Sequence, residues 1–251
     1  MTSNYESKKL LEEYLLLHYG SDKEVLPYDF GPKEALGFPA RGVGLFDFET
    51  LSSKQSALDL GCAVGRGAFE LSKHFEQVLG IDYSESFIDT ASLLRETKQI
   101  EYEYTTQGEL KNSATALLPE GSKCEGVKFE IGDACNLRVD LGSFDVVLAA
   151  NLICRLPEPI KLLERFSSLL KPGGQLVITS PYTWLEEHTS KANWLGGFDK
   201  EASAVRSLDS LKSILEGSFK LELVTDLPFL IREHERKYQW SVAQGTRWRR
   251  S

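Results

Sequence analysis

Apolar and polar positions alternate in blocks along the chain, in the order of an α/β fold. Short apolar stretches that end in glycine or polar residues predict five buried strands. Stretches with apolar residues at three- and four-residue spacing separate them and predict helices. The strands are expected at 57–60, 78–82, 127–131, 143–150 and 175–179, and the helices begin at residues 68, 84 and 157. This order is typical of a mostly parallel sheet with helices on both faces.

The segment before the first strand, residues 1–50, predicts a helical cap and a lid. Residues 5–19 repeat apolar positions at helical spacing, which predicts a helix. Proline and aromatic residues in 26–32 and 38–41 predict a rigid loop, neither helix nor strand. We expect this loop to lie over the cofactor and a short helix to follow over 45–51.

Later segments depart from the plain alternation. Residues 97–126 separate a helix from the next strand by more than a few residues, so we expect an insertion with a hairpin and a loop. Residues 181–206 gather aromatic, acidic and histidine side chains, and we expect a substrate lid. The end of the chain predicts a helix, a strand, a crossing over the sheet and a final antiparallel strand, at 208–215, 219–226, 228–235 and 237–244. We expect one domain over residues 1–251.

The turn after the first strand carries the strongest chemical signal. Gly61 and Gly65 allow a tight turn and a close approach of the backbone to a ligand. A helix begins there, so its first N–H groups face that ligand. A dinucleotide loop places three glycines against a pyrophosphate, but here Ala63 replaces the middle one. Asp59, in the end of the strand, would repel a pyrophosphate and suits a cationic ligand.

Two further acids follow at the next strand ends. Asp82 ends the second strand at about the distance expected for a ribose ligand. Asp133 and Ala134 follow the third strand, where an adenine amino group would be bound. The glycine turn and the acids, in this order, resemble a class I S-adenosylmethionine (SAM)-dependent methyltransferase. An α/β fold that does not bind SAM is the alternative.

The resemblance implies a Rossmann-like fold with a seven-stranded, mostly parallel sheet and an antiparallel last strand. It also implies SAM as cofactor and S-adenosylhomocysteine as its product. Asp59 would orient the methionine ammonium, Asp82 the ribose, and Asp133 with the Ala134 backbone the adenine. Arg41 would pair with the cofactor carboxylate by a forked contact, or is an ordinary surface arginine. The other expected cofactor contacts are Tyr28, Gly61, Cys62, Gly65, Tyr83 and Asn151.

Composition narrows the partners. The net charge of −8 argues against nucleic-acid binding, which needs a positive field. The four cysteines lack the spacing of metal ligands, so we expect reduced thiols and no metal. The sequence has neither a run of about 18 apolar residues nor a signal peptide, so we expect no membrane association and a cytoplasmic protein. Oligomeric state is not readable.

Selective motifs outside the cofactor turn resemble the thiohistidine N-methyltransferases of ovothiol biosynthesis. They lie at 14–20, 26–32, 38–41, 150–156 and 180–189. That family occurs as a stand-alone protein and as the C-terminal domain of the iron-dependent 5-histidylcysteine sulfoxide synthase. The resemblance implies the stand-alone form, with a separate sulfoxide synthase as functional partner. It also implies methyl transfer from SAM to the π nitrogen of 5-thiohistidine, which gives ovothiol A.

Such a substrate is a zwitterion with an imidazole-thiolate ring. Arg155 or Arg232 is the candidate for its carboxylate, and Glu186 or Glu187 for its ammonium. The remaining candidates are Asn151, Tyr182 and Trp184 for the ring plane and His188 as a proton acceptor. Tyr14, His18 or Tyr19 would lie over the cofactor or substrate; the alternative is that this helix only packs against the fold, with His18 capping its end. Among these, Asn151, Tyr182 and His188 are the expected catalytic residues.

Two other functions fit the same motifs. One is methyl transfer to a different small molecule, such as another amino acid or a quinone-like ring. The other is a SAM-binding module without activity. The many polar and aromatic residues of the expected lid favour an enzyme over the module.

Overall fold

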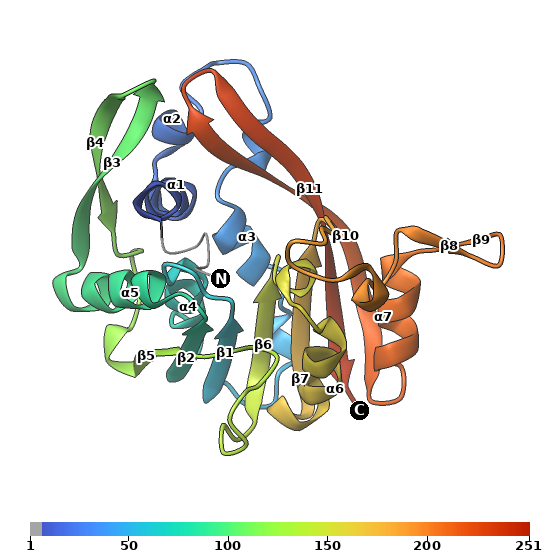
Figure 1. Cartoon of the computed structure of the whole chain (residues 1–251). Helices are drawn as coiled ribbons and strands as arrows, with labels where there is room; N and C mark the ends of the chain where they lie inside the picture. The colour runs from blue at the N-terminus through green and yellow to red at the C-terminus, as the bar shows by residue number, and fades with distance from the viewer. Residues whose placement is uncertain (1–6) are drawn as a thin grey trace.

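The computed structural model describes residues 7–251 and has one large sheet of seven strands in the order β10-β11-β7-β6-β1-β2-β5 (Figure 1). The pairs β5–β2, β2–β1, β1–β6 and β6–β7 are parallel, while β11 is antiparallel to both β7 and β10. The strands are β1 (Ser56–Leu60), β2 (Gln77–Asp82), β5 (Val127–Ile131), β6 (Phe144–Ala150), β7 (Leu170–Ser180), β10 (Phe219–His234) and β11 (Lys237–Arg250). The predicted Rossmann-like sheet with an antiparallel last strand is confirmed.

The helices cover both faces of this sheet. They are α1 (Lys8–Tyr19), α2 (Asp22–Val25), α3 (Phe38–Val43), α4 (Arg66–Leu71), α5 (Glu85–Thr97), α6 (Pro159–Leu169) and α7 (Ser207–Leu215). In β6, Val146 and Leu148 pack with residues of α4 and α5, while Val147 and Ala149 pack with residues of α6 and α7. This alternation follows from the two-residue period of a strand. It explains why β6 is apolar throughout.

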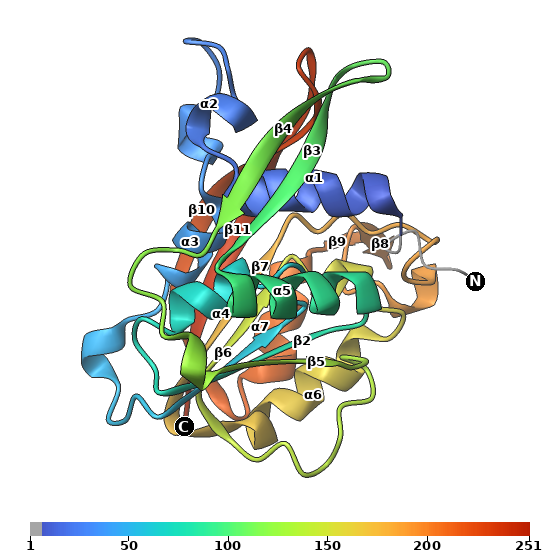
Figure 2. The same ribbon diagram turned by 90° about the vertical axis from the view of Figure 1, so that its left-hand side faces the viewer.

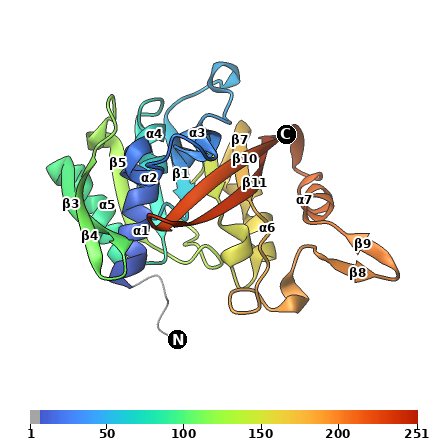
Figure 3. The same cartoon turned by 90° about the horizontal axis from the view of Figure 1, so that it is seen from above.

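Two hairpins extend the fold beyond the sheet. The expected insertion contains the antiparallel pair β3 (Gln99–Gln107) and β4 (Leu110–Leu117). Seen in two perpendicular views, α1 lies between this hairpin and the outer half of β10–β11 (Figures 1 and 2). The second hairpin, β8 (Phe198–Lys200) with β9 (Ser203–Val205), projects away from the rest of the chain (Figure 3).

The expectation of a rigid loop over residues 38–41 was wrong, because these residues form α3. Pro39 lies in the first turn of α3, where its missing N–H has no intrahelical acceptor in any case. Gly37, with φ +64°, makes the left-handed turn that starts it. The short helix expected over 45–51 is a single 3₁₀ turn, Phe48–Thr50.

The crossing expected over residues 228–235 is also absent. Instead β10 continues through this segment and pairs with β11 from Phe219 to His234. Pro228 is tolerated within it because β10 is the edge strand of the sheet, so its missing N–H removes no bond to a further strand. No helix within residues 7–251 is long and apolar enough to cross a membrane.

Candidate functional site

A cavity of about 560 Å³ lies at the carboxyl ends of the parallel strands, beneath α1. The ends of β1, β2, β5 and β6 all contribute to its wall, as expected for a ligand site in an open α/β sheet. Residues from α1, α3, β10 and the segment after β7 complete it. The predicted site residues that line it are Tyr14, His18, Asp59, Gly61, Cys62, Asp82, Tyr83, Asp133, Ala134, Asn151, Arg155, Glu187 and His188.

The turn between β1 and α4 has the geometry that its glycines predict. Gly61 has φ +70°, and its N–H donates to the Ile81 carbonyl at 2.8 Å, which ties the turn to β2. A Cβ on Gly65 would lie 2.7 Å from the Phe129 ring. Gly65 therefore does not line the cavity, and its role is to let α4 pack closely against the sheet.

Asp59 is a buried carboxylate without a cation. It is 2% exposed, and within residues 7–251 its Oδ2 has no hydrogen-bond partner. Burial, and then the negative charge of Asp82, raise the pKa of Asp59 to about 7, although the Ala68 N–H partly offsets this. A ligand ammonium in the cavity would supply the missing donor and the missing positive charge.

The other two acids are oriented by backbone N–H groups. Asp82 accepts hydrogen bonds from the N–H of Ala63 at 2.8 Å and of Ser84 at 2.9 Å. Asp133 accepts from the Cys135 N–H at 2.8 Å. Both carboxylates are thus held at strand ends that line the same cavity as Asp59. Cys62, on the same wall, is buried, and burial raises the pKa of its thiol, so it stays uncharged.

Asn151 follows β6 in a backbone conformation that is uncommon for a residue with a side chain, φ +52°. Its N–H donates to the Thr179 carbonyl at 2.8 Å, and its Oδ1 accepts from the Thr179 hydroxyl at 3.0 Å. The second contact fixes the amide with Nδ2 as the remaining donor. Strained residues held in this way often occur at functional sites.

A charged group lies beyond Asn151, formed by Arg155, Glu187 and His188, and we call it the charged end of the cavity. Arg155 ends a 3₁₀ turn after β6 (Ile153–Arg155), and the other two come from the segment after β7. His188 Nε2 lies 3.2 Å from Glu187 Oε1. Burial, and then the charge of Arg155, lower the pKa of His188, so its ring is neutral at pH 7.

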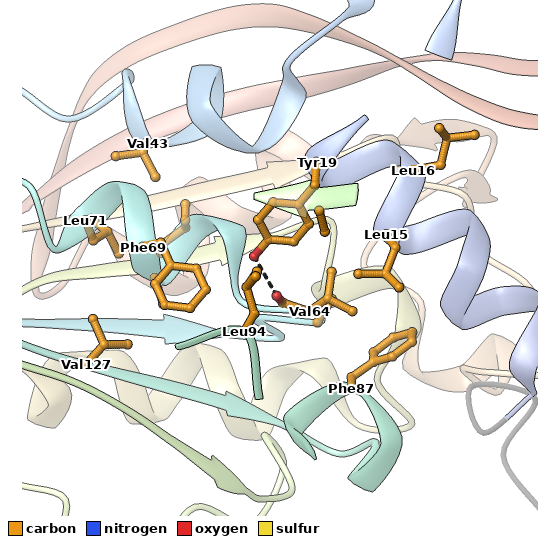
Figure 4. Close-up of a cluster of buried hydrophobic side chains, with 14 of the residues drawn as sticks. Leu15, Leu16, Tyr19, Val43, Val64, Phe69, Leu71, Phe87, Leu94 and Val127 are labelled. Carbon is orange, nitrogen blue, oxygen red and sulfur yellow. Dashed lines mark hydrogen bonds between the residues drawn. The ribbon is translucent and has the colours of Figure 1, made fainter. Parts of the chain in front are cut away.

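Helix α1 closes the cavity with Tyr14 and His18, whose rings stack with centroids 5.8 Å apart. Tyr14 also packs against Phe87 of α5 at 4.9 Å. Tyr19, one residue further, does not line the cavity. Its hydroxyl donates to the Val64 carbonyl at 2.7 Å, so it fastens α1 to the glycine turn (Figure 4).

Two residues expected at the cofactor lie outside the cavity and bind backbone carbonyls. The Tyr28 hydroxyl donates to the Glu235 carbonyl at 2.9 Å. Arg41 Nε donates to the Leu36 carbonyl at 2.9 Å, and the same guanidinium reaches the Pro228 carbonyl. The structure thus gives both side chains contacts that hold the N-terminal segment to β10 or to the turn that follows it.

Four of the substrate candidates also lie elsewhere. The Trp184 ring N–H donates to Ser207 Oγ at 2.9 Å, and the Tyr182 hydroxyl pairs with Gln244 at 3.1 Å. Arg232 is buried, donates to the Glu24 carbonyl and stacks over the Tyr104 ring. Glu186 and Glu187 are both exposed, but only Glu187 lines the cavity. The structure therefore favours Arg155 over Arg232 and Glu187 over Glu186.

Sequence reasoning missed an apolar part of the wall. Phe38 and Pro39 from α3 and Phe229 and Ile231 from β10 line the cavity, and the Phe38 and Phe229 rings lie 5.0 Å apart. The contact between these two rings joins segments about 190 residues apart in the sequence, so no local sequence pattern predicts it. Among residues 7–251, no group of three or more His, Cys, Asp or Glu side chains could hold a metal ion.

Comparison with known proteins agrees with this geometry. Residues 58–178 match a family described as a methyltransferase domain. The chain is 30% identical over 134 residues to phosphoethanolamine N-methyltransferase 3 of Arabidopsis thaliana, which is 53% of this chain and 22% of that protein. It is 28% identical over 131 residues to a ubiquinone biosynthesis O-methyltransferase of Coxiella burnetii, 52% of this chain and 45% of that protein. The chain thus spans less than half the length of these relatives.

Solved structures show the same fold over nearly the whole chain. Magnesium protoporphyrin IX methyltransferase from Synechocystis, with bound S-adenosylhomocysteine, has a TM-score of 0.58 at 16% identity and covers 98% of this chain and 96% of its own. The N-methyltransferase NodS from Bradyrhizobium japonicum, in complex with the same product, has a TM-score of 0.51 at 15% identity, with 96% and 98% covered. Together, the match over residues 58–178 and the fold identify a methyltransferase domain in this chain, with the architecture of SAM-dependent methyltransferases.

Proposed function

We propose that this chain is an N-methyltransferase that transfers the methyl group of SAM to the π nitrogen of 5-thiohistidine and forms ovothiol A. The observation that carries the proposal is the presence, in one cavity, of a carboxylate cluster around Asp59 and a separate charged end with Arg155 and Glu187. The first suits a cationic cofactor and the second a zwitterionic amino acid. The resemblance of the motifs at 14–20, 150–156 and 180–189 to thiohistidine N-methyltransferases supports this choice of substrate.

The carboxylate cluster fits SAM because the ligand would satisfy an acid that the protein leaves unpaired. Asp59 Oδ2 would accept from the methionine ammonium. Asp82, already oriented by two N–H groups, would hold the ribose hydroxyls. Asp133 and the Ala134 backbone would bind the adenine. A phosphate-bearing nucleotide would meet the acids Asp59, Asp82 and Asp133 in the same cavity and would be repelled.

The charged end fits the two ionic groups of an amino acid. The Arg155 guanidinium can bind a carboxylate with two parallel hydrogen bonds. Glu187 offers a carboxylate to the substrate ammonium and lies beside a neutral His188. With one positive and one negative residue, this end would prefer a zwitterion to a simple anion or cation.

Bound SAM supplies a methyl group on a sulfonium, and in the transfer an N–C bond forms while the C–S bond breaks and its electron pair stays on sulfur. The residues of this chain must hold the ring nitrogen in line with that bond. The substrate thiolate is a stronger nucleophile than the nitrogen, so the cavity must also turn the sulfur away. Asn151 Nδ2 is a fixed donor near the strand ends that can orient the ring. His188 is a candidate acceptor for the thiol proton of a substrate that binds protonated.

A product assay tests the proposal. The protein is incubated with SAM and, in separate reactions, with 5-thiohistidine, histidine, an ergothioneine-type thiol and phosphoethanolamine, and the products are identified by mass spectrometry and NMR. We expect methylation of 5-thiohistidine on its π nitrogen. Turnover of another compound alone would replace the substrate, and binding of S-adenosylhomocysteine without turnover of any imidazole would favour a non-catalytic module. If 5-thiohistidine is the substrate, the separate sulfoxide synthase implied by the resemblance would act at an earlier step than this chain.

A further inference from the structure

The C-terminal end of α1 is fixed to the cofactor turn by three contacts. The Tyr19 hydroxyl donates to the Val64 carbonyl at 2.7 Å, and the Arg66 guanidinium donates to the His18 carbonyl at 2.9 Å. The same guanidinium lies 5.6 Å from the centre of the Tyr19 ring. Val64 lies in the turn that begins at Gly61, and Arg66 is the first residue of α4, directly after that turn. The backbone of His18 is therefore held in register with the site that we assign to SAM.

The His18 side chain, in contrast, is left unsatisfied. It lines the cavity, and its Nδ1 is buried without a hydrogen-bond partner in the part of the chain that the structure describes. Buried polar atoms are nearly always paired, so an unpaired one beside a cavity points to a ligand. Burial, and then the charge of Arg66, lower the pKa of His18 to about 3, so the ring is neutral and one of its nitrogens is an acceptor.

The chemistry of the substrate requires such an acceptor. A neutral imidazole ring carries one N–H, and its other nitrogen has the free lone pair. Methylation at the π nitrogen therefore needs the tautomer with its proton on the τ nitrogen, next to the carbon that bears sulfur. With the sulfur as thiolate, no proton has to leave during transfer, because the product keeps the τ N–H and balances its charge as an imidazolium-thiolate.

We propose that His18 accepts a hydrogen bond from the τ N–H of 5-thiohistidine and thereby selects the π nitrogen as the nucleophile. This inference rests on the proposed function. Tyr14, stacked on His18 in the same wall, adds an aromatic face beside the ring. His188 is less suited to the role, because it is already paired with Glu187 at the charged end.

Three variants and two ligands test the proposal. His18→Phe keeps a flat ring but removes the acceptor, and His18→Gln keeps an acceptor on a different frame. His74→Phe is the matched control, since His74 stacks on Phe48 at 3.9 Å and does not line the cavity. Binding of 5-thiohistidine to the protein saturated with S-adenosylhomocysteine is measured by calorimetry, beside the binding of S-adenosylhomocysteine itself. The second substrate ligand is 5-thiohistidine already methylated on the τ nitrogen. It lacks the τ N–H that His18 would bind.

We expect His18→Phe to weaken binding of 5-thiohistidine about tenfold to a hundredfold, the cost of leaving a buried N–H unpaired. His18→Gln should recover part of this loss, and His74→Phe should show none. Affinity for S-adenosylhomocysteine should stay within about twofold in all three, which shows an intact fold. The τ-methylated ligand should bind weakly to the unchanged protein and should lose no further affinity in His18→Phe. Turnover of 5-thiohistidine by His18→Phe should also yield S- or τ-methyl products.

The outcomes separate the two proposals. If the unchanged protein neither binds nor methylates 5-thiohistidine, both are overturned. If it does both, and His18→Phe binds 5-thiohistidine as tightly and makes only the π-methyl product, the role of His18 alone is overturned. The role of His18 is also overturned if the τ-methylated ligand binds more weakly than 5-thiohistidine by the same factor in His18→Phe and in the unchanged protein. In that case the τ N–H and the His18 side chain are not coupled.

Discussion

Replacement of Asp59 by asparagine should strengthen the ligand-free fold and weaken the cofactor site. A carboxyl whose pKa rises from 3.8 to about 7 on folding binds its proton more tightly in the folded chain than in the unfolded chain. Its contribution to stability is therefore present below about pH 4 and is lost as the pH rises to about 7. The loss amounts to at most ~4 kcal/mol, from 1.36 kcal/mol per pH unit. Asp59→Asn removes this penalty and keeps the shape of the side chain.

Urea unfolding of the ligand-free protein at pH 5 and pH 8 measures the first effect. We expect Asp59→Asn to be more stable than the unchanged protein at pH 8 and closer to it at pH 5. Calorimetry with S-adenosylhomocysteine measures the second effect, an affinity loss of about tenfold to a hundredfold for a charged hydrogen bond. The affinity of the unchanged protein should also fall as the pH drops below about 7, up to tenfold per pH unit, because Asp59 must ionise before it pairs with the ammonium.

Two results would contradict the role of Asp59. If Asp59→Asn binds S-adenosylhomocysteine as tightly as the unchanged protein does at pH 8, Asp59 does not hold the ammonium. If the stability difference between variant and unchanged protein is the same at both pH values, the carboxyl is not strained by burial. The control variant is Asp209→Asn on α7, which makes the same change at an exposed acid. Gln175→Glu is not suitable, because it would add a charge at a buried position.

Three further variants test other parts of the site. Asp82→Ala should weaken binding of S-adenosylhomocysteine by ~1–3 kcal/mol in calorimetry, and unchanged affinity would remove the ribose assignment. Arg155→Ala should raise KM for 5-thiohistidine at least tenfold while leaving affinity for S-adenosylhomocysteine unchanged; the reverse pattern would move Arg155 to the cofactor. Tyr19→Phe should lower the free energy of unfolding by ~1–2 kcal/mol in urea, because the Val64 carbonyl loses a buried donor, and an unchanged midpoint would contradict the anchoring role.

The acids at the strand ends were predictable because their geometry is local. Each of Asp59, Asp82 and Asp133 ends or follows a short apolar stretch, and parallel strands bring their carboxyl ends to one edge of the sheet. The order of the strands in the chain was then enough to place the three residues around one cavity. The insertion at 97–126 was visible for a similar reason, since its length did not fit a short connection.

The arginines and aromatic residues were not predictable in the same way. Arg41 and the Pro228 carbonyl that it binds are 187 positions apart, and Arg232 reaches a carbonyl 208 positions away. Sequence shows that such a side chain can bind a carboxylate, but only the packing of β10 against the N-terminal segment decides that it binds a carbonyl. The continuation of β10 through 228–235 thus explains the placement of both residues.

The hydroxyl of Tyr19 joins α1 to a turn 45 positions later in the chain, and this has a consequence for how the site exchanges its contents. Any motion that lifts α1 away must also pull on the Val64 carbonyl and so loosen the glycine turn beneath it. In amide hydrogen exchange, the last turn of α1 and the start of α4 should therefore lose their protection in a single event. A ligand that reaches the cavity without that event has to pass by another wall, and within residues 7–251 the segment at 181–188 makes no hydrogen bond to the turn.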